Sequence, residues 1–227
     1  MSKISIIIPT INEANNLPLL LSDLQITQKE GEIIIVDCGS EDKTIDIANI
    51  YGAKIFISKE RNRGFQLDIG ARNSKGDWLI FLHADTRLTH DWFRKTNSIL
   101  KENKNGIFYF EFKINHKKII YRVLEILVNF RSKFFKQPYG DQGLIIHRTT
   151  YFKNNGFRKI PLMEDVDFLR RLNSKKDLKQ LNSPIFISSR KWERTNIFLQ
   201  AIRNWHYRRR WLKGESLKSI YSDYYKK

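Results

Sequence analysis

Glu32-Ile-Ile-Ile-Val36, followed at once by Asp37-Cys-Gly-Ser40, is the stretch of sequence that decides the fold. Its run of β-branched apolar residues predicts a short strand that is buried on both faces, as the strands of a parallel sheet are. Three further runs share this character and helix-like stretches separate them: residues 4–8, 53–57 and 78–82, with helices expected at 15–24, 42–51 and 65–74. Strands that alternate with helices predict an α/β fold with a doubly wound, mostly parallel sheet.

Acidic side chains follow three of these strands, at the sheet edge where ligands bind in an open parallel sheet. Glu13 comes after the first strand, Asp37 ends the second, and Asp85 follows the fourth. Carboxylates held together repel one another unless a cation or a hydrogen-bond donor lies between them. A nucleotide with a divalent metal supplies both, because such metals prefer oxygen ligands. The pattern therefore indicates a nucleotide site at this edge.

Each of these residues also has a purely structural explanation. Asp37 could serve as a turn residue at the end of its strand. Ser40 could be the N-cap of the following helix, with Asp42 in its first turn and Thr44 on the next. The Gly-rich phosphate loops GxGxxG and GxxxxGK[ST] are missing from the chain. Neither a nicotinamide dehydrogenase nor a Walker-type ATPase is therefore supported.

Composition narrows the class of protein further. The chain has 227 residues, of which 41% are hydrophobic. This is the length of one domain with enough apolar material for a core, which argues against a disordered basic tail. A single cysteine excludes a disulfide framework and a cysteine-rich zinc site. The most apolar segment, 119–130, contains Arg122 and Glu125 and is too short to span a membrane, and the N-terminus does not resemble a signal peptide. We therefore expect a soluble cytoplasmic protein.

The positive charge is unevenly distributed along the chain. The net charge is +17, yet residues 1–100 carry −1, whereas residues 113–136 carry +6 and residues 188–227 carry +8. Both basic segments have amphipathic, partly aromatic patterns. Such segments can lie on an anionic membrane, or they can pack on the core with a solvated basic rim, and the sequence leaves both alternatives open.

Taken together, six motifs resemble the family 2 glycosyltransferases of the GT-A fold, in particular a compact bacterial subgroup, over about residues 3–213. The motifs are residues 6–13, 36–44, 61–64, 82–85, 138–143 and 163–168. The resemblance implies one Rossmann-like GT-A catalytic domain over 1–187, with a nucleotide-sugar half at 1–100 and an acceptor half at 101–187. A basic, aromatic, helical extension would follow at 188–227.

The resemblance also implies roles for residues of the first half. The nucleoside of a UDP- or GDP-sugar would be held by Pro9, Thr10, Glu13, Asp37 and Gly39. Arg63 would add positive charge at the diphosphate. Asp85, as the last acid of a DxD-like motif, would bind Mg²⁺ or Mn²⁺. His83 replaces the first acid of that motif, and it could contact the metal or be a buried histidine that donates to backbone.

The resemblance also implies which residues of the second half bind the acceptor and which one is the catalytic base. Asp141, Gln142 and Glu164 would face the sugar or the acceptor. Asp165 would be the catalytic base of an inverting single displacement. The structural alternatives are a Gly-flanked turn at 140–143 and acids in the first turn of a helix at 165–173. His206 is a candidate third metal ligand, and Arg190 or Arg203 could help neutralise the diphosphate.

The leading hypothesis is thus an inverting, metal-dependent glycosyltransferase that acts on an unknown acceptor hydroxyl or lipid phosphate, with peripheral contact to the inner face of an anionic membrane as one option. A nucleotidyltransferase would need a Gly-rich basic loop after the first strand, which residues 9–13 lack. A nucleic-acid partner is not expected, because the basic residues form no known recognition motif. A membrane-binding or scaffold protein without activity is the remaining alternative.

Overall fold

The computed structural model describes residues 3–27, 30–103, 106–172, 177–188 and 197–225. The strands are β1 (Ile4–Thr10), β2 (Gly31–Asp37), β3 (Lys54–Ile57), β4 (Trp78–Phe81), β5 (Thr86–Leu88), β6 (Ile107–Ile114), β7 (Leu144–His147) and β8 (Leu178–Ile187). The α-helices are α1 (Leu17–Leu24), α2 (Thr44–Ile50), α3 (Arg63–Asn73), α4 (Trp92–Glu102), α5 (Ile119–Phe134), α6 (Arg148–Lys153), α7 (Glu164–Arg171), α9 (Ile197–Leu212) and α10 (Leu217–Tyr225).

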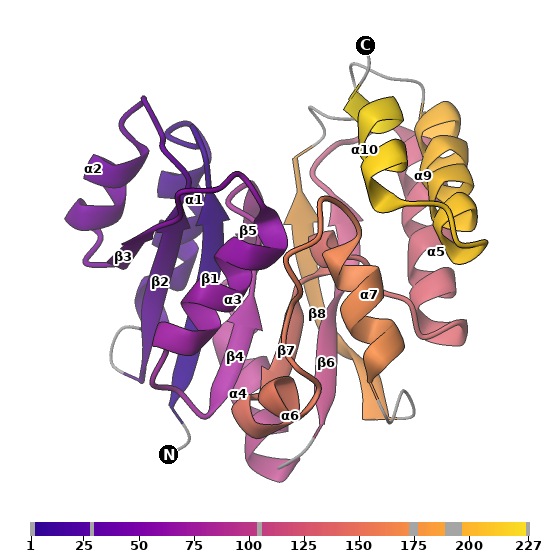
Figure 1. Cartoon of the computed structure of the whole chain (residues 1–227). Coiled ribbons are helices and arrows are strands. Elements are labelled where there is room, and N and C mark those ends of the chain that lie inside the picture. The colour runs from indigo at the N-terminus through magenta and orange to yellow at the C-terminus, as the bar shows by residue number, and fades with distance from the viewer. Residues whose placement is uncertain (1–2, 28–29, 104–105, 173–176, 189–196, 226–227) are drawn as a thin grey trace.

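These strands form one sheet in the order β3-β2-β1-β4-β7-β6-β8-β5 (Figure 1). Strands β1 to β4 run parallel, and the register sets Thr10 beside Asp37 at the carboxyl ends of β1 and β2. The four strands and three helices predicted for the first half are all present. One expectation was wrong: β3 is not buried on both faces, because it is the edge strand and its side chains are half-buried or exposed.

The second half turns the sheet into a mixed one. β7 pairs antiparallel with β4 and β6, β8 pairs parallel with β6, and β5 returns to pair antiparallel with β8. Four of these seven pairings are parallel, so the mostly parallel sheet is confirmed. Because β4 and β8 share this sheet, the first and second halves of the chain meet in one continuous layer.

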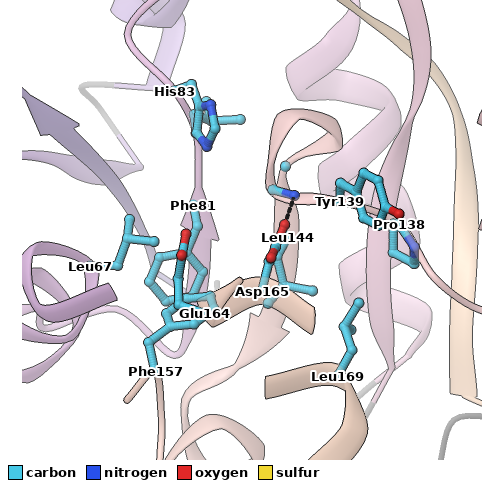
Figure 2. A pocket seen from close by; sticks show the side chains of 13 residues that line it. Leu67, Phe81, His83, Pro138, Tyr139, Leu144, Phe157, Glu164, Asp165 and Leu169 are labelled. Atoms are coloured by element: carbon cyan, nitrogen blue, oxygen red, sulfur yellow. Dashed lines mark hydrogen bonds between the residues drawn. The ribbon is translucent and has the colours of Figure 1, made fainter. Parts of the chain in front are cut away.

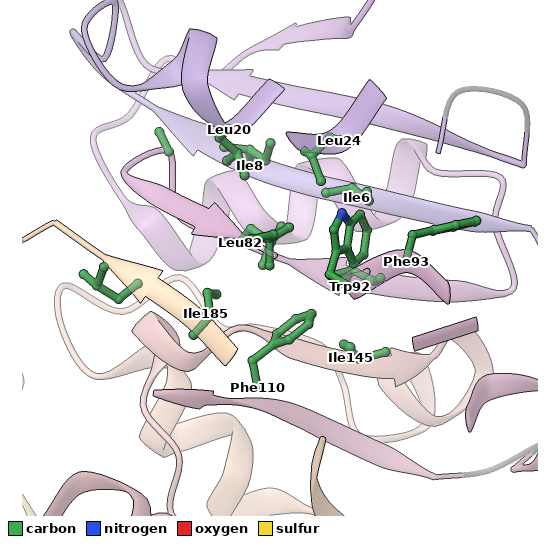
Figure 3. Close-up of a cluster of buried hydrophobic side chains, with 14 of the residues drawn as sticks. Ile6, Ile8, Leu20, Leu24, Leu82, Trp92, Phe93, Phe110, Ile145 and Ile185 are labelled. Atoms are coloured by element: carbon green, nitrogen blue, oxygen red, sulfur yellow. The ribbon is translucent and has the colours of Figure 1, made fainter. Parts of the chain in front are cut away.

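The core lies in two layers on opposite faces of the sheet, since successive side chains of a strand point to opposite faces. Ile6 and Ile8 of β1 face a cluster that includes Leu20 of α1 and Trp92 of α4 (Figure 3). Ile7, between them, faces the other cluster, which also contains residues of α3, α6 and α7. Each fully buried side chain of this size stabilises the fold by roughly 1.5–3 kcal/mol.

The C-terminal helices α9 and α10 pack on each other. The hydroxyl of Tyr207 donates to the carbonyl of Asp223 at 3.2 Å, and Arg210 forms ion pairs with Glu215 and Asp223. The Arg210 guanidinium lowers the pKa of Glu215 to about 2. None of the helices in the described ranges is long and apolar enough to cross a bilayer.

Candidate functional site

Asp37 is the centre of the first loop cluster, and the structure buries it completely. Its carboxylate accepts hydrogen bonds from the Thr10 hydroxyl at 2.8 Å, from the Ser40 amide at 2.8 Å and from the Ser40 hydroxyl at 2.5 Å. In this conformation the Asp37 carboxylate is bonded by Thr10 and Ser40, and the expected contact of Asp37 and Thr10 with a nucleoside stays a prediction. Pro9 and Glu13 are half-buried and Gly39 is exposed, so these three reach the surface of the same edge.

The loops after β1 and β2 are tied together by backbone amides that donate to side chains. The Asn12 amide donates to the Ser40 hydroxyl, and the Glu13 amide donates to the Thr44 hydroxyl, each at 2.8 Å. The N-cap alternative for Ser40 is therefore wrong, because α2 begins only at Thr44 and Ser40 bonds to Asp37 and Asn12 instead. These cross-links hold the loops after β1 and β2 in a fixed arrangement.

Gln66 is a positioning residue that the sequence reasoning missed. Its side-chain amide donates to the carbonyl of Thr10 at 3.1 Å and to the carbonyl of Val36 at 2.8 Å. These bonds fasten α3 across the carboxyl ends of β1 and β2. The sequence does contain a signal for this role. Gln66 is an amide among apolar neighbours on the face of a helix that packs on the sheet, and a buried polar side chain must have hydrogen-bond partners.

The motif Arg61-Asn-Arg-Gly64 joins the two halves of the chain. Asn62 caps α3 by accepting from the Phe65 amide at 2.9 Å, and its side-chain amide donates to the carbonyl of Ile160 at 2.8 Å. A Cβ at Gly64 would lie 2.5 Å from the Arg158 carbonyl oxygen and 2.9 Å from the Cβ of Glu164. Only glycine, which has no Cβ, lets α3 approach so closely. The motif thus fixes the start of α7, which carries the predicted base.

Arg63 and Glu164, expected at opposite ends of the reaction, form an ion pair. Burial would lower the pKa of the Arg63 guanidinium, but the carboxylates of Glu164, Asp165 and Asp141 outweigh it and raise that pKa well above its ordinary value. The three predicted acceptor-side acids thus all act on one cation, and Glu164 pairs with it directly. Arg63 is still exposed enough to face a diphosphate, with 43% of its side-chain surface open to solvent.

Asp165 lines a pocket whose other lining residues come from both halves of the chain (Figure 2). Its Oδ2 accepts from the Gly140 amide at 2.6 Å and its Oδ1 from the Val166 amide at 2.7 Å. His83, at the end of β4, lies close to Asp165. A Cβ added at Gly140 would be 3.3 Å from the His83 Nε2 and 3.4 Å from the Asp165 Oδ2, so Gly140 lies close to both groups. A carboxylate and an imidazole from different halves of the chain therefore face one small volume. Glu164 also lines the pocket, and apolar side chains, including Leu67, Phe81, Leu144, Phe157 and Leu169, form most of the remaining wall.

Two unusual backbone conformations hold these groups. Gly143 has φ 63° and ψ 154°, a combination that is essentially restricted to glycine. Met163, immediately before α7, has φ 61° and ψ 31°. This is the left-handed region, which is uncommon for a residue with a side chain. Together they set the loop 140–142 against the first turn of α7.

Gln142 does not face the pocket, in contrast to the expectation. It is fully buried, accepts from the Ser132 hydroxyl at 2.6 Å and donates to the Phe110 carbonyl at 3.4 Å. Its neighbour Asp141 adds its charge to the field at Arg63. The loop therefore turns its amide side chain into the core to anchor itself on α5.

In the described part of the chain, few side chains are placed to coordinate a metal ion. Among the described residues no group of three or more His, Cys, Asp and Glu side chains is arranged to hold an ion. Asp85 is half-buried in the turn that follows β4, close in sequence to His83 of the pocket wall. One or two protein ligands completed by phosphate oxygens and water is how Mg²⁺ is usually held beside a nucleotide, so these residues fit a metal that arrives with a diphosphate.

The remaining candidates lie elsewhere. His206 is exposed on α9, against the ring of Tyr207 and near Glu215, and is not part of the pocket wall. Arg203 is exposed on the same helix, with its guanidinium 6.0 Å from the Tyr207 ring centroid. Arg190 is outside the described residues.

A sequence profile for glycosyl transferase family 2 matches residues 5–166, which is most of the chain and spans both the loops after β1 and β2 and the start of α7. The chain belongs to glycosyltransferase family 2. The resemblance inferred from the six motifs is confirmed. The profile ends within the first turn of α7, just past Asp165, so it covers the residues from Pro9 to Asp165 described above but not Leu169, Arg190 or the residues on α9.

Relatives with names are similar to the chain over shorter stretches. A PGL/p-HBAD biosynthesis glycosyltransferase of Mycobacterium bovis is 40% identical over 37% of this chain and 36% of its own length. A 4,4'-diaponeurosporenoate glycosyltransferase of Staphylococcus haemolyticus is 36% identical over 39% of this chain and 25% of its own. The matches thus span only about a quarter to just over a third of these relatives' own length.

Solved structures share the fold at low identity. TarS of S. aureus has a TM-score of 0.67 and 18% identity, with 82% of this chain and 60% of that chain covered. Glucosyl-3-phosphoglycerate synthase of Mycobacterium tuberculosis has a TM-score of 0.56 and 15% identity, with 82% and 70% covered. The fold is therefore GT-A, as the resemblance implied.

Proposed function

We propose that this chain is an inverting, metal-dependent glycosyltransferase that moves a sugar from a UDP- or GDP-sugar to an acceptor hydroxyl or a lipid phosphate at or near a membrane. The observation that carries the proposal is the Asp165 carboxylate, held by the Gly140 amide beside His83 at the pocket between the two halves. Membership of family 2 supports the reaction class.

Asp165 is suited to the role of base by its position. A carboxylate within reach of an acceptor hydroxyl takes the proton as the oxygen attacks the anomeric carbon. The new bond forms on one face of the sugar while the bond to the diphosphate oxygen breaks on the other, and its electron pair leaves with the diphosphate, so the configuration inverts. Arg63, already surrounded by carboxylates, stays protonated. It can therefore offset the charge that develops on the leaving group.

The nucleoside would rest on the edge formed by Pro9, Glu13 and Gly39. Thr10 and Asp37 position this edge from beneath through their mutual hydrogen bond. Support for a uridine nucleotide comes from TarS, which was solved with UDP and with UDP-GlcNAc. Asp141 and Glu164 would border the sugar and the acceptor, and Gln142 would act only by anchoring their loop.

Asp85, with His83 as a second donor, would hold Mg²⁺ or Mn²⁺ together with the diphosphate. When bound, the metal would act as a Lewis acid that stabilises the negative charge developing on the leaving diphosphate. The M. tuberculosis glucosyl-3-phosphoglycerate synthase, which was solved with Mn²⁺ and UDP, supports this choice.

A thermal-shift screen of UDP- and GDP-sugars, with and without Mn²⁺, tests the proposal. A donor at 100 times its dissociation constant stabilises the folded state by ~2.7 kcal/mol, which should raise the Tm by roughly 5–10 °C for a chain of this size. Asp85→Asn should remove the part of the shift that needs Mn²⁺. Glu102→Gln, at the exposed end of α4, is the matched control and should keep it. The absence of a shift with every donor would contradict the proposal.

A further inference from the structure

The outer face of α5 is an exposed apolar surface. Six large side chains, each with 45–82% of its surface exposed, form what we call the α5 stripe: Ile119, Val123, Ile126, Leu127, Phe130 and Phe134. At about 100° per residue they fall within a sector of about 100°, so they make one continuous band along the helix. The rings of Phe130 and Phe134 lie 4.3 Å apart between centroids, which joins the band at its C-terminal end.

The opposite face of α5 already has its partner. Tyr121, Leu124 and Ser132 are buried against the sheet, and the Glu125 carboxylate accepts from the Ile114 amide at 2.6 Å. Core packing therefore explains the inner face and leaves the α5 stripe unexplained. An apolar patch of this extent on a protein surface marks a site of interaction with a protein or a membrane.

The charge around the α5 stripe indicates which kind of surface binds it. Residues 113–136 contain seven Lys and Arg but a single acid, Glu125, which is buried and paired with Arg122. Lys117, Lys118 and Lys133 are exposed at the ends of the helix. A symmetric dimer through this face would bring the basic rim against its own copy, because both subunits use the same patch. An anionic lipid surface meets both the apolar band and the cations.

We propose that the α5 stripe docks the protein on an anionic membrane, with α5 lying in the plane of the interface. An amphipathic helix of this kind inserts its apolar face roughly 5–10 Å into the headgroup region, while lysines at its ends meet the lipid phosphates. Exposed Ile202 and Trp205 on α9, with the Arg209 guanidinium 5.2 Å from the Trp205 ring centroid, repeat the combination of apolar and basic side chains.

The docking surface leads directly to the pocket. Phe134 ends α5, Phe135 is also exposed, and Pro138 and Tyr139 already line the pocket beside Asp165. The Arg131 guanidinium of α5 stacks on the Tyr139 ring at 3.6 Å and couples the helix to this wall. If the pocket performs the proposed transfer, on which this step rests, the acceptor is an amphiphile that presents its hydroxyl or phosphate from the membrane while its apolar part stays there.

Co-sedimentation with vesicles tests the docking. The protein should bind vesicles of phosphatidylcholine mixed with phosphatidylglycerol, bind vesicles of phosphatidylcholine alone far more weakly, and lose binding as salt rises. Ile126→Glu with Phe130→Glu should weaken binding about 100-fold or more, since two buried apolar contacts are lost. Lys117→Gln and Lys118→Gln should each weaken it about fivefold at low salt.

Ile50→Glu is the matched control, because Ile50 is 81% exposed on α2 and its substitution should leave binding unchanged. Failure of the unchanged protein to bind the mixed vesicles would overturn the proposal. So would a dimer of the unchanged protein that Ile126→Glu with Phe130→Glu converts to a monomer, since the stripe would then be a protein interface. The donor-induced thermal shift of this double variant separates the two hypotheses: it should persist when vesicle binding is lost.

Discussion

The ion pair between Arg63 and Glu164 gives a sharp prediction about stability, because its two partners differ in burial. Only 4% of the Glu164 side-chain surface is exposed, against 43% for Arg63. Arg63→Gln would leave the Glu164 carboxylate beside Asp165 and Asp141 without its cation. Removing one partner of a fully buried pair costs ~3–5 kcal/mol, and screening by water on the exposed side of Arg63 should reduce this to about 2 kcal/mol.

The reverse substitution should be milder. Glu164→Gln keeps an oxygen that can accept from the Arg63 Nε–H and leaves the cation near solvent, so we expect a loss of about 1 kcal/mol. With both residues changed to Gln, no uncompensated charge remains. The double variant should then be less destabilised than the sum of the single variants, by about 1–1.5 kcal/mol.

Urea unfolding followed by circular dichroism measures these free energies of unfolding. The Tm of Arg63→Gln should fall by roughly 4–8 °C. Arg72→Gln on the same helix is the control, since Arg72 pairs with Asp68 but has 65% of its side-chain surface exposed. The loss for this control should stay under about 1 kcal/mol. Strict additivity in the cycle, or an Arg63→Gln loss no larger than that of the control, would refute the reasoning.

Two further substitutions test the second half of the chain. The Tyr109 hydroxyl is buried with no hydrogen-bond partner among the described residues. Tyr109→Phe should therefore stabilise the protein by about 1 kcal/mol in thermal unfolding. Burial also raises the pKa of Tyr109 to about 12. The stability that the unchanged protein gains from this raised pKa is present below pH ~10 and is lost as the pH rises through ~12. The Tyr109→Phe variant should therefore lose less free energy of unfolding over that range than the unchanged protein does. The positive φ of Gly143 disfavours a side chain, so Gly143→Ala should cost about 2 kcal/mol, and an unchanged urea midpoint would contradict this.

The first half of the fold could be predicted well because its signals are local. The run of Ile33, Ile34 and Ile35, ended by Asp37, is enough to predict a parallel strand, and the alternation with helices predicts the topology. The second half was harder. β8 is ten residues long but contains Asn182, Ser183 and Pro184, and its pairing with β5 brings together segments about 100 residues apart, which no local pattern encodes.

The site, too, could be predicted only in part from the sequence. Residue types and motifs could predict that Asp165 and Arg63 belong to one site, but not that Arg63 binds Glu164, because that pairing depends on how closely Gly64 lets α3 approach α7. Gln142 points into the core for a related reason: the turn at Gly143 rotates its side chain toward Ser132. The α5 stripe could not be told from a core-facing stripe until the sheet was seen to cover the other side of the helix.

Turnover of the nucleotide sugar by Asp165→Asn tests the central claim most directly. The asparagine oxygen can still accept from the Gly140 amide, so the loop should keep its place, but the amide cannot take a proton from the acceptor. With the donor found in the thermal-shift screen, release of nucleoside diphosphate should fall about 10²–10⁴-fold, while the donor Kd measured by calorimetry stays within about threefold. Turnover equal to that of the unchanged protein would contradict the assignment of Asp165 as the base.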